Sequence, residues 1–228
     1  MLMVHTTSLY DPGEMETRRR MYVARQTWER AYREFPNIVS GHQVISRAAR
    51  TSASIGDDRR LPFVKDLVEF AFGLKTNAPV DAAIMTNTDT CMIPSRIPAA
   101  FDSLQSRGCY YSFRYEHGGF IRPLDDAAVG SAPIYSGADL FAFTRAWWER
   151  HRDDYPDLLL GAEAWDGVLK VMMNDSGFEP GSPIVYHEAH AAHWSQHLLT
   201  SPSQLHNRKL AAEWIERKRI PSFLCPAS

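Results

Sequence analysis

The order of apolar and amphipathic segments constrains the fold of this chain more than any other feature. Residues 1–8 form a short apolar run that ends in hydroxyl side chains, residues 14–35 carry apolar side chains at helical spacing, and residues 37–45 have the pattern of a second strand. A strand, a helix and a strand in this order favour a parallel pair joined by a right-handed crossover. The opening therefore predicts an α/β fold.

The rest of the chain continues this alternation. Further strands are expected over 81–86, 109–115 and 182–186, and further helices over 61–73, 94–106, 138–151, 161–173 and 203–219. No internal repeat, low-complexity tract or composition break marks a linker. We therefore expect one domain over residues 1–228, with a mostly parallel central sheet flanked by helices.

Charge and composition exclude several function classes. The chain has 25 Lys and Arg against 27 Asp and Glu, a formal net charge of -2. Because non-specific nucleic-acid binding depends on many basic contacts to phosphates, no general nucleic-acid binding is expected. No apolar stretch reaches the ~18 residues that a transmembrane helix needs, and the first residues lack a signal-peptide pattern. The expected location is cytoplasmic, so we interpret Cys91, Cys109 and Cys225, which lack CxxC spacing, as reduced thiols.

The apolar run at residues 81–86 leads directly into Asn87, Thr88 and Asp89. A run this short and apolar is typical of a central strand covered on both faces, and open α/β sheets bind ligands at the carboxyl ends of such strands. The amide and carboxylate oxygens there could hold a hard divalent cation. The alternative is an Asx turn that only ends the strand.

A second acidic pair opens the helix expected over residues 161–173. Glu163 and Asp166 stand at i and i+3, so both point to one side of that helix. Neighbouring carboxylates raise one another's pKa, and one of them could then act as a general base on a hydroxyl group. The alternative is stabilisation of a helix start by the helix dipole, with Asp166 paired to Lys170.

A histidine-rich segment follows the last expected strand. On a helix, His187, His190, His193 and His197 would share one face, but their spacing is not the HExxH of the zinc proteases. We expect one or two of them to bind metal. His187 is the best candidate, because the preceding apolar run would deliver it to the sheet edge that carries Asp89. His193 and His197 are expected to be surface or hydrogen-bonded side chains.

Basic and hydroxyl side chains complete the set of candidates. Arg59, Arg60 and Lys65 form a local basic group that suits a diphosphate, although a solvated helix face would look the same. Thr6 and Thr7 end the first expected strand, where a ligand could also bind.

These segments, in this order, resemble nucleotide-sugar glycosyltransferases of the A-type fold, in particular the family-2-like and galactosyltransferase-like groups. DDRRLPFVKDLVEFAFG and VDAAIMTNTDTCMIP resemble the basic segment, helix and strand that end in the Asp-x-Asp metal motif. YSGADLFAFTRAWW is similar to the acceptor-side segment, LGAEAWD to the later acidic motif, and VYHEAH to the late metal-binding histidine. The likeness spans residues 4–195, leaving 196–228 as a C-terminal helical segment.

The resemblance implies a role for each matching residue. Asn87 replaces the first acid of the metal motif, so Asp89 takes the metal-ligand role together with His187 or His190. Ala164 stands where the base often lies, which passes that role to Asp166 or Glu163. The contacts to the nucleotide sugar would come from Thr6, Thr7, Arg59, Lys65, Asn87 and Asp89.

The implied activity is metal-dependent transfer of a sugar from a nucleoside-diphosphate sugar to an unidentified hydroxyl acceptor, with inversion. The implied fold is a single Rossmann-like A-type glycosyltransferase domain, and the implied cofactor is Mn²⁺ or Mg²⁺. Two alternatives stay open. One is a metal-dependent hydrolase built on the histidine cluster, and the other is a non-catalytic relative that binds nucleotide sugars, which the departures at Asn87 and Ala164 would permit.

Overall fold

A computed structural model of the chain describes residues 3–8, 15–38, 42–45, 50–58, 60–74, 79–119, 132–190 and 200–220, without the side chains of 4–8 and 42–45. The strands are β1 (Met3–Ser8), β2 (His42–Ile45), β3 (Ala82–Thr86), β4 (Cys91–Met92), β5 (Cys109–His117), β6 (Ile134–Thr144) and β7 (Val185–Glu188). The α-helices are α1 (Met15–Glu34), α2 (Val64–Gly73), α3 (Ile97–Arg107), α5 (Arg145–His151), α6 (Trp165–Asp175) and α7 (Pro202–Lys218). Two short 3₁₀ helices are η1 (Ser52–Ile55) and η2 (Pro94–Arg96).

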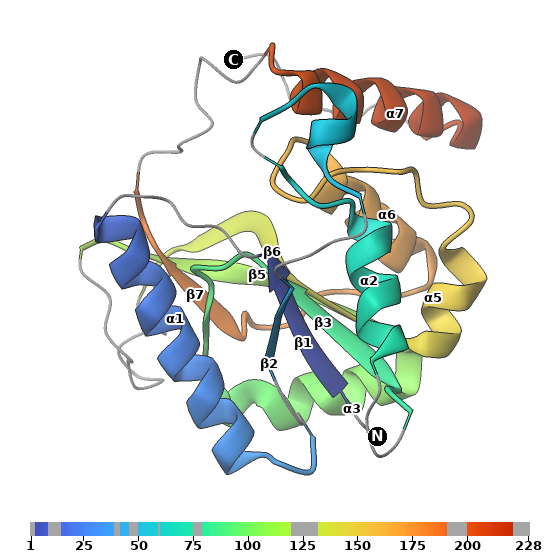
Figure 1. Ribbon diagram of the computed structural model, residues 1–228. Helices are drawn as coiled ribbons and strands as arrows, with labels where there is room; N and C mark the ends of the chain where they lie inside the picture. The colour runs from blue at the N-terminus through green and yellow to red at the C-terminus, as the bar shows by residue number, and fades with distance from the viewer. Residues whose placement is uncertain are drawn as a thin grey trace.

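The strands form one curled, mixed sheet in the order β2-β1-β3-β6-β5-β7-β4 (Figure 1). β1 pairs in parallel with β2 and β3, as the opening segments predict. β6 lies at the centre and runs antiparallel to both of its neighbours, β3 and β5. β7 is parallel to β5, and β4 is antiparallel to β7. β3, β5 and β7 therefore point the same way, and their carboxyl ends share one edge of the sheet.

The expected mostly parallel, Rossmann-like sheet is wrong, and the error lies in residues 138–144. We expected them to begin a helix, but they form the buried half of β6, and only residues 145–151 are helical. Helices cover both faces of β6, and most of this half is buried, so it is a nearly continuous apolar run. Such a run has the same pattern in a buried strand and in a buried helix. Reading it as a helix removed the antiparallel centre from the expected sheet.

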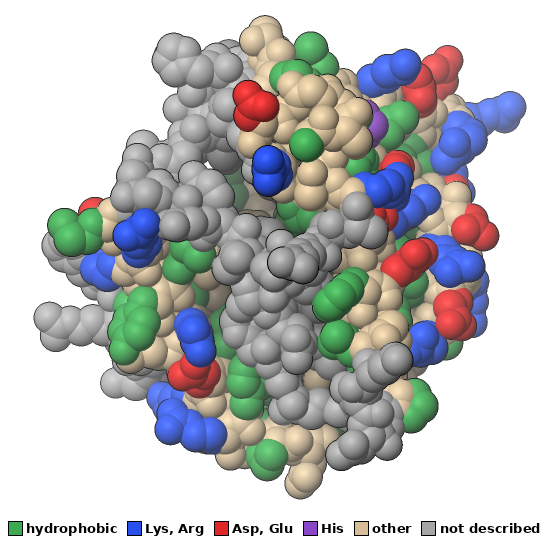
Figure 2. Space-filling model, in the orientation of Figure 1, with side chains coloured by type: hydrophobic (Ala, Val, Ile, Leu, Met, Phe, Trp, Pro, Cys, Tyr) green, Lys and Arg blue, Asp and Glu red, His purple; other side chains and the backbone are tan. Residues whose placement is uncertain are grey.

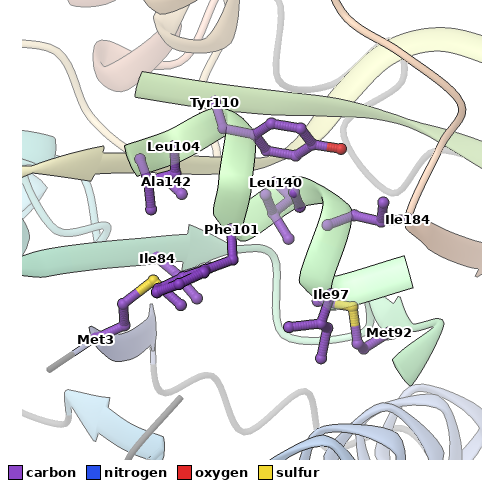
Figure 3. A pocket seen from close by; sticks show the side chains of 11 residues that line it. Met3, Ile84, Met92, Ile97, Phe101, Leu104, Tyr110, Leu140, Ala142 and Ile184 are labelled. Atoms are coloured by element: carbon purple, nitrogen blue, oxygen red, sulfur yellow. The ribbon is translucent and has the colours of Figure 1, made fainter. Parts of the chain in front are cut away.

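Helices cover both faces of the sheet. On one face, the Ile84 side chain points toward α3 (Figure 3). On the other face, α2 contacts β1 and β3, α5 contacts β6, and α6 contacts β5 and β6 (Figure 1). Phe143 stacks on Trp147 and Trp148, and Phe141 meets Trp165 edge to face with ring centroids 5.3 Å apart. The core is thus a packed aromatic and aliphatic layer on each side of β3 and β6.

Most of the other expected elements are present, with ends shifted by a few residues. α1, α2, α3, α6 and α7 match expected helices, and β3 is buried along its whole length. The helical arrangement considered for the histidine segment is wrong where it can be seen, because His187 belongs to β7 and residues 189–190 are not helical. His193 and His197 lie outside the described residues, as does Cys225, while Cys91 and Cys109 are buried free thiols.

Within the described ranges, no helix combines the length and apolar character needed to cross a bilayer. Acidic and basic side chains are intermixed along the face formed by α7, α2 and α5 (Figure 2). This mixture agrees with the small net charge of the chain.

Candidate metal centre

The structure brings Asp89, His187 and His190 together at one edge of the sheet. Asp89 follows β3, His187 is the third residue of β7, and His190 comes two residues after that strand ends. Because β3 and β7 point the same way, their carboxyl ends deliver these side chains to the same edge, although about 100 residues of chain separate them. The predicted proximity of Asp89 and His187 is confirmed.

The three side chains point their ligand atoms at a common place. His187 Nε2 lies 3.2 Å and His190 Nε2 lies 3.3 Å from the same Asp89 oxygen, Oδ2. One ligand atom from each residue fits within a span of 4.8 Å, and the imidazole centroids are 4.8 Å apart. His187 is buried, and the other two are half-buried. A carboxylate and two imidazoles in this arrangement could chelate one divalent cation.

The charge state of Asp89 suits a metal ligand. Burial alone would raise the pKa of this carboxyl group, but the hydrogen bonds and charges of His187 and His190 outweigh burial and hold the pKa well below its ordinary value. Asp89 is therefore ionised at neutral pH.

The loop that carries Asp89 is fixed by the first helix. Trp28 Nε1 donates a hydrogen bond of 2.9 Å to the Thr90 carbonyl, and Met92 N donates one of 2.9 Å to the Thr27 hydroxyl. Thr90 N also donates to the Asn87 carbonyl at 3.4 Å and closes a turn. This hydrogen bond joins backbone atoms, so it closes a backbone turn and is not the side-chain bond of the Asx turn considered as the alternative to a metal site; the turn presents Asp89 to the histidines.

A chain of polar contacts supports His187 from behind. Its Nδ1 lies 3.6 Å from Glu116 Oε1, on the side of the ring opposite Asp89. Arg114 Nε donates to Glu116 Oε1 at 2.6 Å, Arg114 Nη1 donates to Asp139, and Asn87 Nδ2 donates to Asp139 Oδ1 at 3.2 Å. A metal-binding histidine usually donates its second ring N–H to a carboxylate. At 3.6 Å, Glu116 places a negative charge beside His187 Nδ1 without a hydrogen bond to it.

Asp139 is a buried acid that the sequence interpretation missed. Its side chain is 6% exposed, and burial raises its pKa against the lowering effect of the Arg114 charge. The sequence signal was available, because Asp139 is a single charge that opens the apolar run LFAF. A buried carboxylate normally requires a cationic partner, and Arg114 fills that role here.

Two arginines of α1 also reach this edge and were not predicted. Arg19 Nη2 donates to both oxygens of Glu188 at 2.5 Å. Arg20, which is 5% exposed, has its Nε 4.0 Å from Asp89 Oδ2 and its Nη1 3.8 Å from Glu188 Oε1. The signal lay in the helix periodicity, since Arg20 falls at i-3 and i-4 from the buried residues Val23 and Ala24.

The other predicted donor contacts are placed only in part. Lys65 lies in the first turn of α2, half-buried, and no ion pair joins it to Asp89 among the described residues. Thr6 and Thr7 belong to β1, beside β2 and β3, but their side chains lie outside the described part of the structure, as does Arg59. Their contacts with a nucleotide sugar stay predictions.

The predicted base candidates belong to another contact network. Glu163 Oε2 accepts a hydrogen bond of 2.6 Å from Arg208 Nε on α7, and Asp166 lies in the first turn of α6. Among the described residues, no hydrogen bond or ion pair links either acid to Asp89. Ala164, between them in sequence, has a left-handed backbone with φ of 72°. The general-base role of Glu163 or Asp166 stays a prediction.

A small apolar cavity of about 30 Å³ lies between α3 and the sheet (Figure 3). Phe101 and Leu104 of α3 face Ile84, Leu140 and other core side chains across it. It shares no residue with the Asp89 cluster. The cavity is a packing gap within the core.

Comparison with known proteins leaves the functional assignment to the site itself. A scan against known protein families found no match for this chain, and a search of curated proteins found no relative.

Proposed function

We propose that the chain is a divalent-metal-dependent glycosyltransferase that uses a nucleoside-diphosphate sugar. The observation that carries the proposal is the convergence of Asp89, His187 and His190 at the strand ends, with Glu116 behind His187. The order of the sequence motifs supplies the donor class. The proposal rests on no relative of the chain.

The ligand set favours Mn²⁺ over Mg²⁺. Mg²⁺ prefers oxygen ligands in near-ideal octahedral geometry, whereas imidazole nitrogens suit transition metals. Asp89 would contribute one oxygen, and His187 and His190 would contribute one nitrogen each. A bound divalent cation would neutralise charge that develops on the departing nucleoside diphosphate.

The protein side chains would hold and orient the reactants. Asp89, ionised and fixed by the turn at residues 87–90, keeps one oxygen directed at the two imidazoles. Asn87 stands two residues before Asp89, and its side chain donates a hydrogen bond to Asp139. In this position Asn87 can contact a ribose hydroxyl or a bridging water. Asp166 would remove the proton of the acceptor hydroxyl, with Glu163 as the second candidate for that role.

The proposal is tested by incubating the protein with a panel of nucleotide sugars and Mn²⁺ while nucleoside diphosphate release is measured. We expect Mn²⁺-dependent release from one donor, and loss of release in Asp89→Ala. Asp102→Ala is the matched control, because Asp102 is an exposed acid on α3. Full activity of Asp89→Ala, or nucleoside diphosphate release that does not depend on Mn²⁺, would contradict the proposal.

The second candidate is a metal-dependent hydrolase, and one observation favours it. Two histidines and one carboxylate, with a position left open, form the ligand set of several hydrolytic zinc sites. This function requires tightly bound Zn²⁺ and hydrolysis without a nucleotide sugar. Metal analysis of the purified protein and a panel of ester and amide substrates separate the two candidates. A non-catalytic relative would bind the donor without turnover.

A further inference from the structure

Arg20 is a buried cation at the border of the candidate metal centre. Its Nε lies 4.0 Å from Asp89 Oδ2, the same oxygen that His187 and His190 approach. Its Nη2 donates to Thr17 at 2.8 Å, one turn earlier on α1, which holds the guanidinium in place. A metal bound to Asp89 would therefore lie next to a fixed positive charge.

This placement opposes binding of a metal alone. An arginine side chain stays protonated in proteins, so the repulsion cannot be relieved by loss of a proton. Water screens charges poorly at a buried position, so a neighbouring divalent cation would feel the repulsion strongly. Glu188 lies 2.5 Å from Arg19 Nη2 and 3.8 Å from Arg20 Nη1, so two guanidinium groups share its single negative charge.

The same placement favours a metal that arrives with an anion. The charges of Asp89 and Glu188 balance those of Arg19 and Arg20, so a divalent cation placed among these four side chains adds positive charge. A diphosphate group can contact the metal and the guanidinium together, and guanidinium groups bind phosphate oxygens through paired hydrogen bonds.

We infer that Arg20 is a diphosphate-binding residue that makes metal binding at Asp89 depend on the diphosphate. Arg20 weakens the binding of the metal alone and strengthens the binding of the metal-diphosphate complex. The inference rests on the metal centre of the proposed function, and it adds a residue and a binding order that the sequence motifs did not contain.

The test measures two affinities in Arg20→Met by calorimetry, one for Mn²⁺ alone and one for a preformed complex of Mn²⁺ with inorganic pyrophosphate. We expect the two to move in opposite directions. Mn²⁺ alone should bind about fivefold more tightly than to the wild type, because the repulsion is gone. The complex should bind at least about tenfold more weakly, because hydrogen bonds to charged groups are lost.

Two further variants make the result specific. Arg25→Met, on the same helix, removes an exposed arginine paired with Glu29 and should change neither affinity. Arg20→Lys keeps the charge without the paired donors, so Mn²⁺ alone should bind as in the wild type and the complex should bind with intermediate affinity. Circular dichroism of each variant shows whether it is folded.

The outcomes separate this inference from the proposed function. If both affinities of folded Arg20→Met fall together or stay unchanged, the role of Arg20 is wrong while the metal centre stands. If the wild type binds Mn²⁺ tightly but not the pyrophosphate complex, the inference is again wrong. If the wild type binds neither, the metal centre itself is wrong, and the inference fails with it.

Discussion

Asp89 and Glu163 are both acids that the sequence singled out, but the fold treats them differently. Asp89 faces two imidazoles, His187 and His190, which are side chains that bind metals when neutral. Glu163 faces Arg208 of α7, a cation that binds no metal.

The backbone around Glu163 reinforces this difference. Glu163 N donates to Gln204 at 2.7 Å, and the Glu163 carbonyl accepts from Asn207 Nδ2 at 2.8 Å. All of these contacts hold α7 against the start of α6. In the described structure the contacts of Glu163 therefore join α6 to α7, whereas the Asp89 region retains atoms that can bind a cation. An acid that the sequence singles out has to be judged by its partners, because sequence spacing alone does not separate these two roles.

The largest expected difference between the two regions concerns metal affinity. Asp89→Ala should weaken Mn²⁺ binding by more than about 100-fold, since even the loss of supporting residues behind a ligand costs about 10–100-fold. Glu163→Ala should leave the affinity unchanged. Calorimetric titration of both variants checks this, and similar losses in the two would remove the distinction between the regions.

The α7 contact should matter for stability instead. Asn207 is fully buried, accepts from Leu159 N at 2.9 Å, and donates to the carbonyls of Leu159 and Glu163. Asn207→Ala leaves these groups unsatisfied, so we expect the free energy of unfolding to fall by about 3 kcal/mol in urea denaturation. Mn²⁺ affinity should not change. Glu213→Ala, at an exposed position of the same helix, is the control, and an equal loss there would exclude this explanation.

The support behind His187 provides a smaller test. Glu116→Gln keeps the shape of the side chain but removes the negative charge that faces His187 Nδ1. Mn²⁺ affinity should fall by about tenfold. The exposed Glu149→Gln serves as the comparison and should bind like the wild type. An unchanged affinity in Glu116→Gln would mean that His187 needs no such support.

The smallest effect is expected for the ion pair between Glu163 and Arg208. Both side chains are more than one third exposed, at 34% and 39%, so water and salt screen the pair. Glu163→Gln should lower the free energy of unfolding by less than about 1 kcal/mol. Urea denaturation at low and high salt measures this loss in the free energy of unfolding. A much larger loss would show that Glu163 is a central part of the α6–α7 contact.

The sequence predicted the outer elements of the fold better than its centre. Amphipathic helices such as α1 and short buried strands such as β3 have distinct patterns, and both were expected where they lie. The buried half of β6 has no distinct pattern, because helices cover both of its faces. That one segment decided whether the sheet was mostly parallel or mixed.

The candidate site was predictable where a residue lies at the carboxyl end of an expected strand or follows it. Asp89, His187 and His190 satisfy that condition, so their position at the sheet edge follows from the chain order. Glu116 lies at the end of β5 and was not singled out, and Arg20 reaches the edge from a helix. Such contacts depend on how the elements pack across the sheet, which local sequence patterns do not encode.

The most direct test of the account is a crystal structure of the protein grown with Mn²⁺ and inorganic pyrophosphate, with anomalous diffraction data collected at the manganese edge. The account predicts one strong anomalous peak within bonding distance of Asp89 Oδ2, His187 Nε2 and His190 Nε2. A map with no peak there, or with manganese bound only elsewhere, would contradict it.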